Sequence, residues 1–100
     1  MTIDQIKEKV IPIAKEYGVT KIALFGSVAK GTATENSDVD FLIDKGDSHK
    51  MRGWDFFDFE NEVSEALGVK AEVFTYRGIQ DSIIKDSILE NEVVIYEYKI

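Results

Sequence analysis

Residues 22–43, IALFGSVAKGTATENSDVDFLI, decide the fold. An apolar run, Ile22–Phe25, leads directly into Gly26 and Ser27, and ten residues then separate Ser27 from Asp38. A second apolar run follows Asp38, and the polar, turn-rich residues between the runs would return the chain to it. The stretch therefore predicts two neighbouring strands with a glycine–serine turn after the first and acidic residues at the start of the second.

The acidic residues Asp38 and Asp40 are two positions apart. In a strand they would point to the same face, with Cα atoms roughly 6.5–7 Å apart, while Val39, Phe41 and Ile43 point the other way and supply the burial. Two carboxylates on one face repel each other unless a cation lies between them. Mg²⁺ takes oxygen ligands from one or two carboxylates together with substrate phosphates, so the pattern indicates a magnesium site.

The glycine–serine turn suits the other half of such a site. Gly26 can adopt backbone angles closed to other residues and lets a ligand approach closely. Ser27 would begin a short helix through Lys30, and its hydroxyl and the free N–H groups of that turn are suited to phosphate. Phosphate donors beside metal-binding carboxylates indicate a nucleoside triphosphate site.

These residues carry a family resemblance. Gly26-Ser27, ten residues and then Asp38-x-Asp40 resemble the motif of the DNA polymerase β-type nucleotidyltransferase superfamily, and in particular its minimal nucleotidyltransferase (MNT) branch. The resemblance covers nearly all of the 100 residues. It implies an α/β fold of the α+β type, with helices packed on a small mixed sheet and a site at one edge. Residues 1–100 would form a single minimal nucleotidyltransferase domain.

The family pattern also implies the chemistry. Asp38, Asp40 and a third carboxylate would hold two Mg²⁺ ions, and AMP would pass from ATP to a hydroxyl group. By alignment the third acidic residue is Glu72, where relatives commonly have Asp, and it would also accept the proton. Gly26 and Ser27 would grip the terminal phosphates. Lys30 stands in the segment where many relatives carry Arg, and it lacks the planar fork that suits bidentate phosphate contact.

The resemblance also implies a partner. Similar proteins are commonly encoded beside a HEPN-domain ribonuclease and act as its antitoxin, in some cases by adenylylating a tyrosine of the toxin. We therefore expect a HEPN toxin as the acceptor. Two alternatives stay open: a catalytically weak module that neutralises the toxin by masking it, and a small-molecule nucleotidyltransferase, which normally adds a second domain.

Composition limits the other partners. The formal net charge is −7, with 19 acidic and 12 basic residues, so the chain is a poor candidate for direct nucleic-acid binding. No apolar run approaches the roughly 20 residues that span a bilayer, and no signal peptide opens the chain. There are no cysteines. A cytoplasmic location without a membrane partner is the expectation.

The rest of the chain supplies further elements. Thr2 and Gln5 form the pattern of a capping box that opens a helix, in which Pro12 should cause a kink or a split. Gly18 should end it. A further strand is predicted at residues 70–76, and residues 93–96 should be short and extended.

Two other helices are predicted. Residues 54–67 are rich in aromatic side chains, of which Trp54 and Phe57 fall off the core-facing stripe. A wide buried face is favoured for them over a contact surface. The last helix should span Ile79–Leu89, with apolar side chains at core spacing: Ile79, Ile83, Ile84 and Ile88. The pattern gives three strands and four helices in all.

Overall fold

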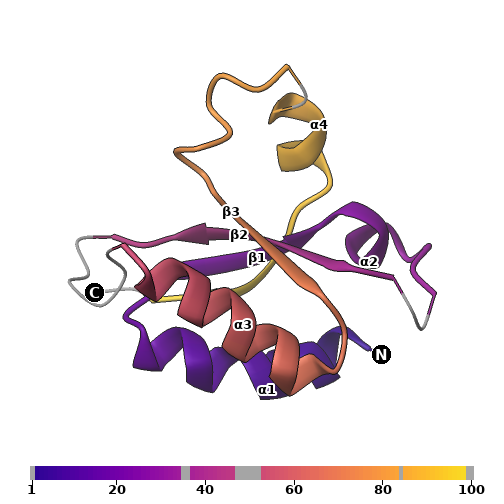
Figure 1. Cartoon of the computed structure of the whole chain (residues 1–100). Helices are drawn as coiled ribbons and strands as arrows, with labels where there is room; N and C mark the ends of the chain where they lie inside the picture. Colours follow the sequence, from indigo (N-terminus) through magenta and orange to yellow (C-terminus); the bar gives the residue numbers. More distant parts are fainter. Residues whose placement is uncertain (1, 35–36, 47–52, 84, 99–100) are drawn as a thin grey trace.

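The protein is built on a four-stranded mixed sheet, seen here in a computed structural model (Figure 1). The structure describes residues 2–34, 37–46, 53–83 and 85–98. Its strands are β1 (Lys21–Phe25), β2 (Val39–Asp44), β3 (Ala71–Thr75) and β4 (Val93–Glu97), and its helices are α1 (Ile3–Glu16), α2 (Gly26–Lys30), α3 (Asp55–Leu67) and α4 (Lys85–Glu90). The predicted fold class, helices on a small mixed sheet, is confirmed.

The strand order is β3-β2-β1-β4. β1 lies antiparallel to both β2 and β4, whereas β2 and β3 are parallel. A parallel pair needs a long crossover, and α3 lies within the one between β2 and β3. Figure 1 shows α1 and α3 side by side beneath one face of the sheet, with α4 and its flanking segments above the other and α2 at the end of β1.

Helix α1 begins with the predicted capping box. The Gln5 backbone N–H donates to Thr2 Oγ1 at 3.1 Å, and the Thr2 N–H donates to Gln5 Oε1 at 2.8 Å. The helix continues through Pro12 to Glu16, so the proline does not split it. The chain leaves the helix at Tyr17 and Gly18, as predicted.

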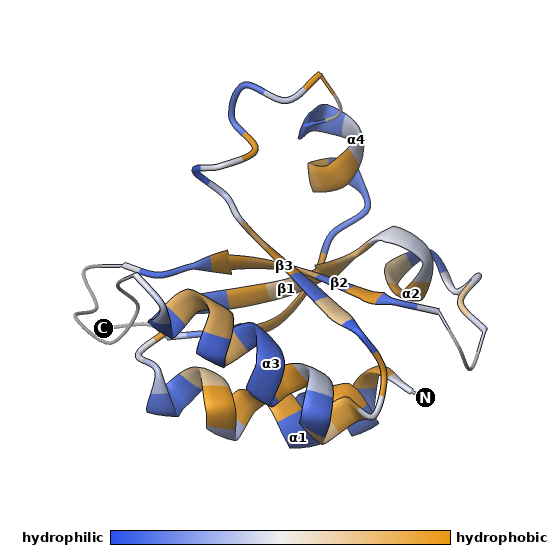
Figure 2. Ribbon diagram, viewed as in Figure 1, coloured by the Kyte–Doolittle hydropathy of each residue, from blue (hydrophilic) through white to orange (hydrophobic). Residues whose placement is uncertain are grey.

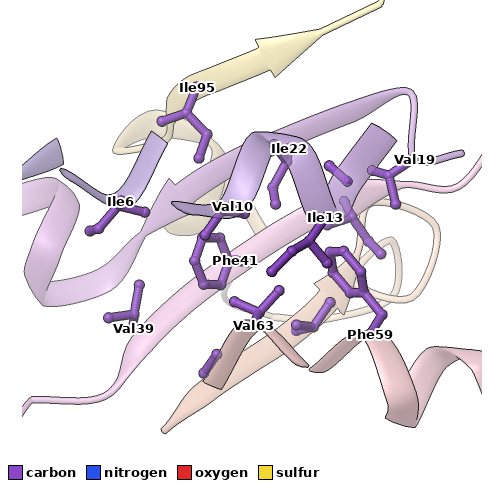
Figure 3. Close-up of a cluster of buried hydrophobic side chains, with 14 of the residues drawn as sticks. Ile6, Val10, Ile13, Val19, Ile22, Val39, Phe41, Phe59, Val63 and Ile95 are labelled. Carbon is purple, nitrogen blue, oxygen red and sulfur yellow. The ribbon is translucent and has the colours of Figure 1, made fainter. Parts of the chain in front are cut away.

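The main core lies between the sheet and the layer formed by α1 and α3, as Figure 3 shows. Phe41 and Phe59 are its largest fully buried side chains. In Figure 2 the apolar sides of α1 and α3 turn toward the sheet and their polar sides turn outward. The alternation along β2, with Val39, Phe41 and Ile43 buried in this core, is the predicted one and leaves Asp40 on the opposite face.

The aromatic segment at the start of α3 differs from the favoured expectation. Trp54 is 79% exposed and Phe57 is 53% exposed, so a buried face that includes them is wrong. Phe59 lies in the buried stripe, and a residue two positions away on a helix points about 200° around the axis, toward solvent. The rings of Trp54 and Phe57 instead pack on each other, with centroids 5.6 Å apart. Their role as a contact surface stays a prediction.

The predicted helix over Ile79–Leu89 is also wrong in its first half. Helix α4 begins only at Lys85, and Ile83, expected in the core, is fully exposed. The preceding segment forms turns instead of a helix, and the Thr75 hydroxyl there accepts a hydrogen bond from the Gly78 N–H at 2.8 Å. Ile79 still reaches a second buried cluster with Ala23 and Leu42. Ile84 lies outside the described residues.

The segment after α4 forms a fourth strand, which the sequence pattern did not count. β4 pairs with β1 along the sheet edge, with an irregularity in register between Ile22 and Ala23. The Tyr76 hydroxyl donates to Glu92 Oε2 at 2.6 Å, so the residue that follows β3 contacts the residue that precedes β4. None of the helices in the described ranges is both long and apolar enough to cross a membrane.

Candidate active site

The pairing of three strands brings together the predicted catalytic residues. Asp40 lies beside Glu72 in the parallel β2–β3 register and beside Phe25 in the antiparallel β1–β2 register. Side chains paired across neighbouring strands share a face, so Asp40 and Glu72 lie together on the face opposite the main core. Asp38 is exposed just before β2 begins. The site therefore lies at the start of the two parallel strands.

Gly26 brings the glycine–serine turn against Asp40. Its φ of 72° is in the left-handed region, which only glycine adopts freely. A Cβ atom at this position would overlap Asp40 Oδ2 and come within 3.4 Å of Asp40 Cγ. The Asp40 carboxylate therefore occupies the space that a side chain at position 26 would take.

The carboxylates of the site repel one another in the metal-free protein. Burial, then the charge of Glu72 and then that of Asp38 raise the pKa of Asp40 above its usual range. Across the described ranges, no three His, Cys, Asp or Glu side chains are already gathered to hold a metal ion. Carboxylate oxygens are ligands that Mg²⁺ prefers, and a cation would relieve the repulsion felt by Asp40. The donor set therefore fits a divalent ion.

Glu72 has a cationic neighbour that the sequence analysis missed. Lys70 Nζ lies 3.4 Å from Glu72 Oε1. Lys70 lies directly before β3 and Glu72 lies within it, two positions further on, which is the spacing that puts side chains on one face of an extended chain. That spacing was the available signal, because a lysine two residues before an acidic strand residue is placed to pair with it.

The predicted phosphate-binding residues lie on α2. Ser27 is partly buried in its first turn, and its carbonyl accepts from the Thr32 N–H at 2.9 Å. Lys30 is exposed in the last turn, and Gly31 ends the helix in the left-handed conformation at φ 76°. The structure thus brings Gly26 against the Asp40 carboxylate, puts Ser27 directly after it in the first turn, and leaves Lys30 at the far end of a five-residue helix.

Comparison with known families matches this site to a domain. The model of the "Nucleotidyltransferase domain" family matches residues 3–95, which include every residue of the site. The chain belongs to the nucleotidyltransferase domain family. The resemblance drawn from the glycine–serine and Asp38-x-Asp40 motifs is thereby confirmed, and the chain is identified as a nucleotidyltransferase.

Relatives with similar sequences carry related names. The nucleotidyltransferase is 38% identical over 94 residues to a protein of Methanocaldococcus jannaschii named as an inferred protein adenylyltransferase, covering 94% of this chain and 97% of that one. It is 28% identical over 94 residues to the protein adenylyltransferase MntA of Thermococcus cleftensis, covering 90% and 93%.

Solved structures share the fold. A structure described as an inferred minimal nucleotidyltransferase superposes with a TM-score of 0.70 at 25% identity, covering 93% of this chain and 95% of that one. A chain from a toxin–antitoxin crystal structure with AMP-PNP gives a TM-score of 0.76 at 18% identity, covering 93% and 74%. A chain from a mutant of the MntA–HpeT toxin–antitoxin gives 0.73 at 14% identity, with the same coverage.

Proposed function

We propose that this nucleotidyltransferase is a Mg²⁺-dependent protein adenylyltransferase. It would transfer AMP from ATP to a tyrosine hydroxyl of a HEPN ribonuclease toxin and so act as its antitoxin. The observation that carries the proposal is the position of Asp40, between Gly26 on one side and Glu72 on the other. This arrangement puts a turn suited to phosphate against carboxylates suited to a metal.

Each residue has a defined part in the reaction. Asp38, Asp40 and Glu72 would hold two Mg²⁺ ions, which neutralise charge on the α-phosphate and on the departing pyrophosphate. Gly26 and Ser27 would hold the terminal phosphates, with Lys30 as a supporting charge. These assignments rest on the family motif and on the side chains that the register gathers.

The transfer step forms one bond and breaks one. The oxygen of the acceptor hydroxyl attacks the α-phosphorus of ATP, and the bond from the α-phosphorus to the oxygen bridging it to the β-phosphate breaks. The electron pair of that bond leaves with pyrophosphate. Glu72 accepts the hydroxyl proton, because its side chain is only partly buried and lies on the same face as Asp40.

The choice of a protein as the acceptor of AMP is based on the names of similar proteins and structures. Two of the similar proteins bear names that specify protein adenylyltransferases, and two of the structural neighbours come from toxin–antitoxin assemblies, one of them with AMP-PNP. These similarities support a protein acceptor in a toxin. The HEPN identity and the tyrosine rest on the family resemblance.

One observation favours masking as a second candidate function. Glu72 stands where relatives commonly have Asp, and its carboxylate already pairs with Lys70. A site whose third carboxylate is engaged in this way would transfer AMP slowly, and neutralisation would then depend on binding alone.

Labelled ATP separates the two functions. The chain, Mg²⁺ and a HEPN ribonuclease toxin, the proposed partner, would be incubated with ATP labelled at the α-phosphate and, in parallel, at the γ-phosphate. Transfer of AMP labels the toxin only from the α-position. Asp40→Asn should abolish labelling, whereas Asp44→Asn, at the exposed far end of the same strand, should retain it. A wild-type protein that binds and inhibits the toxin without labelling it would establish masking instead.

A further inference from the structure

Lys70 is positioned among the acidic side chains of the site. Its backbone carbonyl accepts from the Val39 N–H at 3.0 Å, directly before the Val39–Ala71 pair of the parallel register. Extending that register by one residue places Lys70 opposite Asp38. Its ammonium group, 3.4 Å from Glu72 Oε1, is thus held at the entrance to the two strands that carry the carboxylates.

The Lys70–Glu72 ion pair affects the electrostatics of the site more than the stability of the fold. The side chains are 68% and 37% exposed, and ion pairs of this kind contribute little to folding. The charge matters locally, however, because Glu72 and Asp38 both act on Asp40. An ammonium group on Glu72 offsets part of that repulsion. A divalent ion needs the same carboxylate oxygens, so the lysine and the metal cannot both hold them fully.

We propose that Lys70 is a positioning residue that acts as the counter-cation of Glu72 in the metal-free protein and competes with the divalent ion for it. The inference rests on the proposed function, since it takes Glu72 as a metal ligand. The ammonium group of Lys70, 3.4 Å from Glu72 Oε1, already engages the third carboxylate. The lysine therefore lowers the affinity of the site for metal alone.

The test measures binding of Mn²⁺ without nucleotide, by electron paramagnetic resonance, together with the metal-free Tm. Lys70→Met removes the charge but keeps an unbranched apolar side chain, and Lys70→Arg keeps the charge. Lys9→Met removes one positive charge from an exposed position on α1 and controls for net charge. Loss of a unit positive charge 3.4 Å from Glu72 Oε1 should tighten Mn²⁺ binding about 3–5-fold in Lys70→Met. Binding by Lys70→Arg should stay near wild type.

Two further measurements make the result decisive. The metal-free Tm of Lys70→Met should fall by about 2–4 °C, since an exposed ion pair and its relief of repulsion are lost. In a Glu72→Gln background, Lys70→Met should no longer tighten Mn²⁺ binding. Tightening that persists in this background, or that Lys9→Met matches, overturns the inference.

The inference and the proposed function fail in different ways. A wild-type protein that transfers AMP, combined with unchanged Mn²⁺ binding in Lys70→Met, overturns the role of Lys70 alone. Absence of Mn²⁺ binding in the wild type and in every variant also overturns the role of Lys70, whereas the proposed function is overturned by absence of AMP transfer in the labelling experiment.

Discussion

Gly26→Ala tests whether the close approach of the glycine–serine turn to Asp40 organises the site. The substitution adds a Cβ atom that would overlap Asp40 Oδ2. Gly31→Ala is a matched control, because Gly31 has a nearly equal φ, 76° against 72°, and nothing lies within 4 Å of its added Cβ. The two variants share the backbone strain and differ in the contact with Asp40.

The expected loss of stability is similar in the two variants. A left-handed alanine costs roughly 1–2 kcal/mol, so each variant should unfold about 4–16 °C below wild type. Gly26→Ala has one further cost. The obstructing atom lies at the end of a rotatable side chain, so Asp40 can turn aside for about 0.5–1.5 kcal/mol. The additional cost should disappear when Gly26→Ala is made in an Asp40→Ala background.

The expected loss of activity differs strongly between the variants. Misplacement of a catalytic group by 1 Å can cost about 10²-fold in rate, so Gly26→Ala should lose at least about that factor in AMP transfer. Gly31→Ala should stay within a few-fold of wild type at a temperature where both are folded. Urea denaturation and single-turnover labelling with ATP would measure the two effects. Equal activity losses, or a wild-type rate in Gly26→Ala, would refute the proposed role of the contact.

Three further predictions concern charges and hydrogen bonds. Asp40→Asn should hold or raise the metal-free Tm at pH 7. Burial, Glu72 and Asp38 raise the pKa of Asp40, so wild-type stability is lost as the pH rises through that pKa. In thermal scans the gain in Tm should vanish below pH 3.8, and a fall in Tm at pH 7 would contradict the prediction. Tyr17→Phe removes a 2.8 Å hydrogen bond to Glu62 and should cost about 0.5–1 kcal/mol. Because that bond raises the pKa of Tyr17 to about 12, the difference should persist up to pH 10.0 and be lost as pH rises through about 12, which urea titrations across this range would follow. Glu72→Gln should slow AMP transfer by about 10²–10⁴-fold while calorimetry finds ATP binding nearly intact, and Glu72→Asp should be tolerated; a wild-type rate in Glu72→Gln would remove Glu72 from the mechanism.

The sheet was predictable because its signals are local. The alternation after Asp38 predicted β2. The apolar run Ile22–Phe25 and the predicted strand at residues 70–76 match β1 and β3 to within a residue at each end. Burial on one face and carboxylates on the other follow from the same period of two. The pairing of Asp40 with Glu72 required the family pattern, because no periodicity within one strand specifies which strand lies beside it.

The incorrect helix and burial predictions share a physical cause. Periodicity alone does not say which part of the sheet is free to cover an apolar side chain. Ile79, Ile83 and Ile88 have helical spacing, but the Thr75 hydroxyl and the Gly78 N–H close a turn that competes with a helix there. Ile83 is left exposed as a result. Phe57 was expected to belong to a wide buried face, whereas α3 buries only one stripe against the sheet. Lys70 was missed because its importance depends on the position of Glu72.

The geometry of the site ultimately depends on the core beneath it. A slip of one residue in the β2–β3 register would move Glu72 to the buried face and carry Val73 out of the core. Two hydrogen bonds from α3 oppose such a slip: the Ala71 N–H donates to Ser64 Oγ at 2.9 Å, and the Val73 N–H donates to Glu60 Oε2 at 3.0 Å. They occupy N–H groups on the outer edge of β3, which would otherwise be open to pairing with another strand. Helix α3 therefore holds the register that carries Glu72 while its apolar side fills the core, and the face of the candidate site is set by contacts on the opposite side of the sheet.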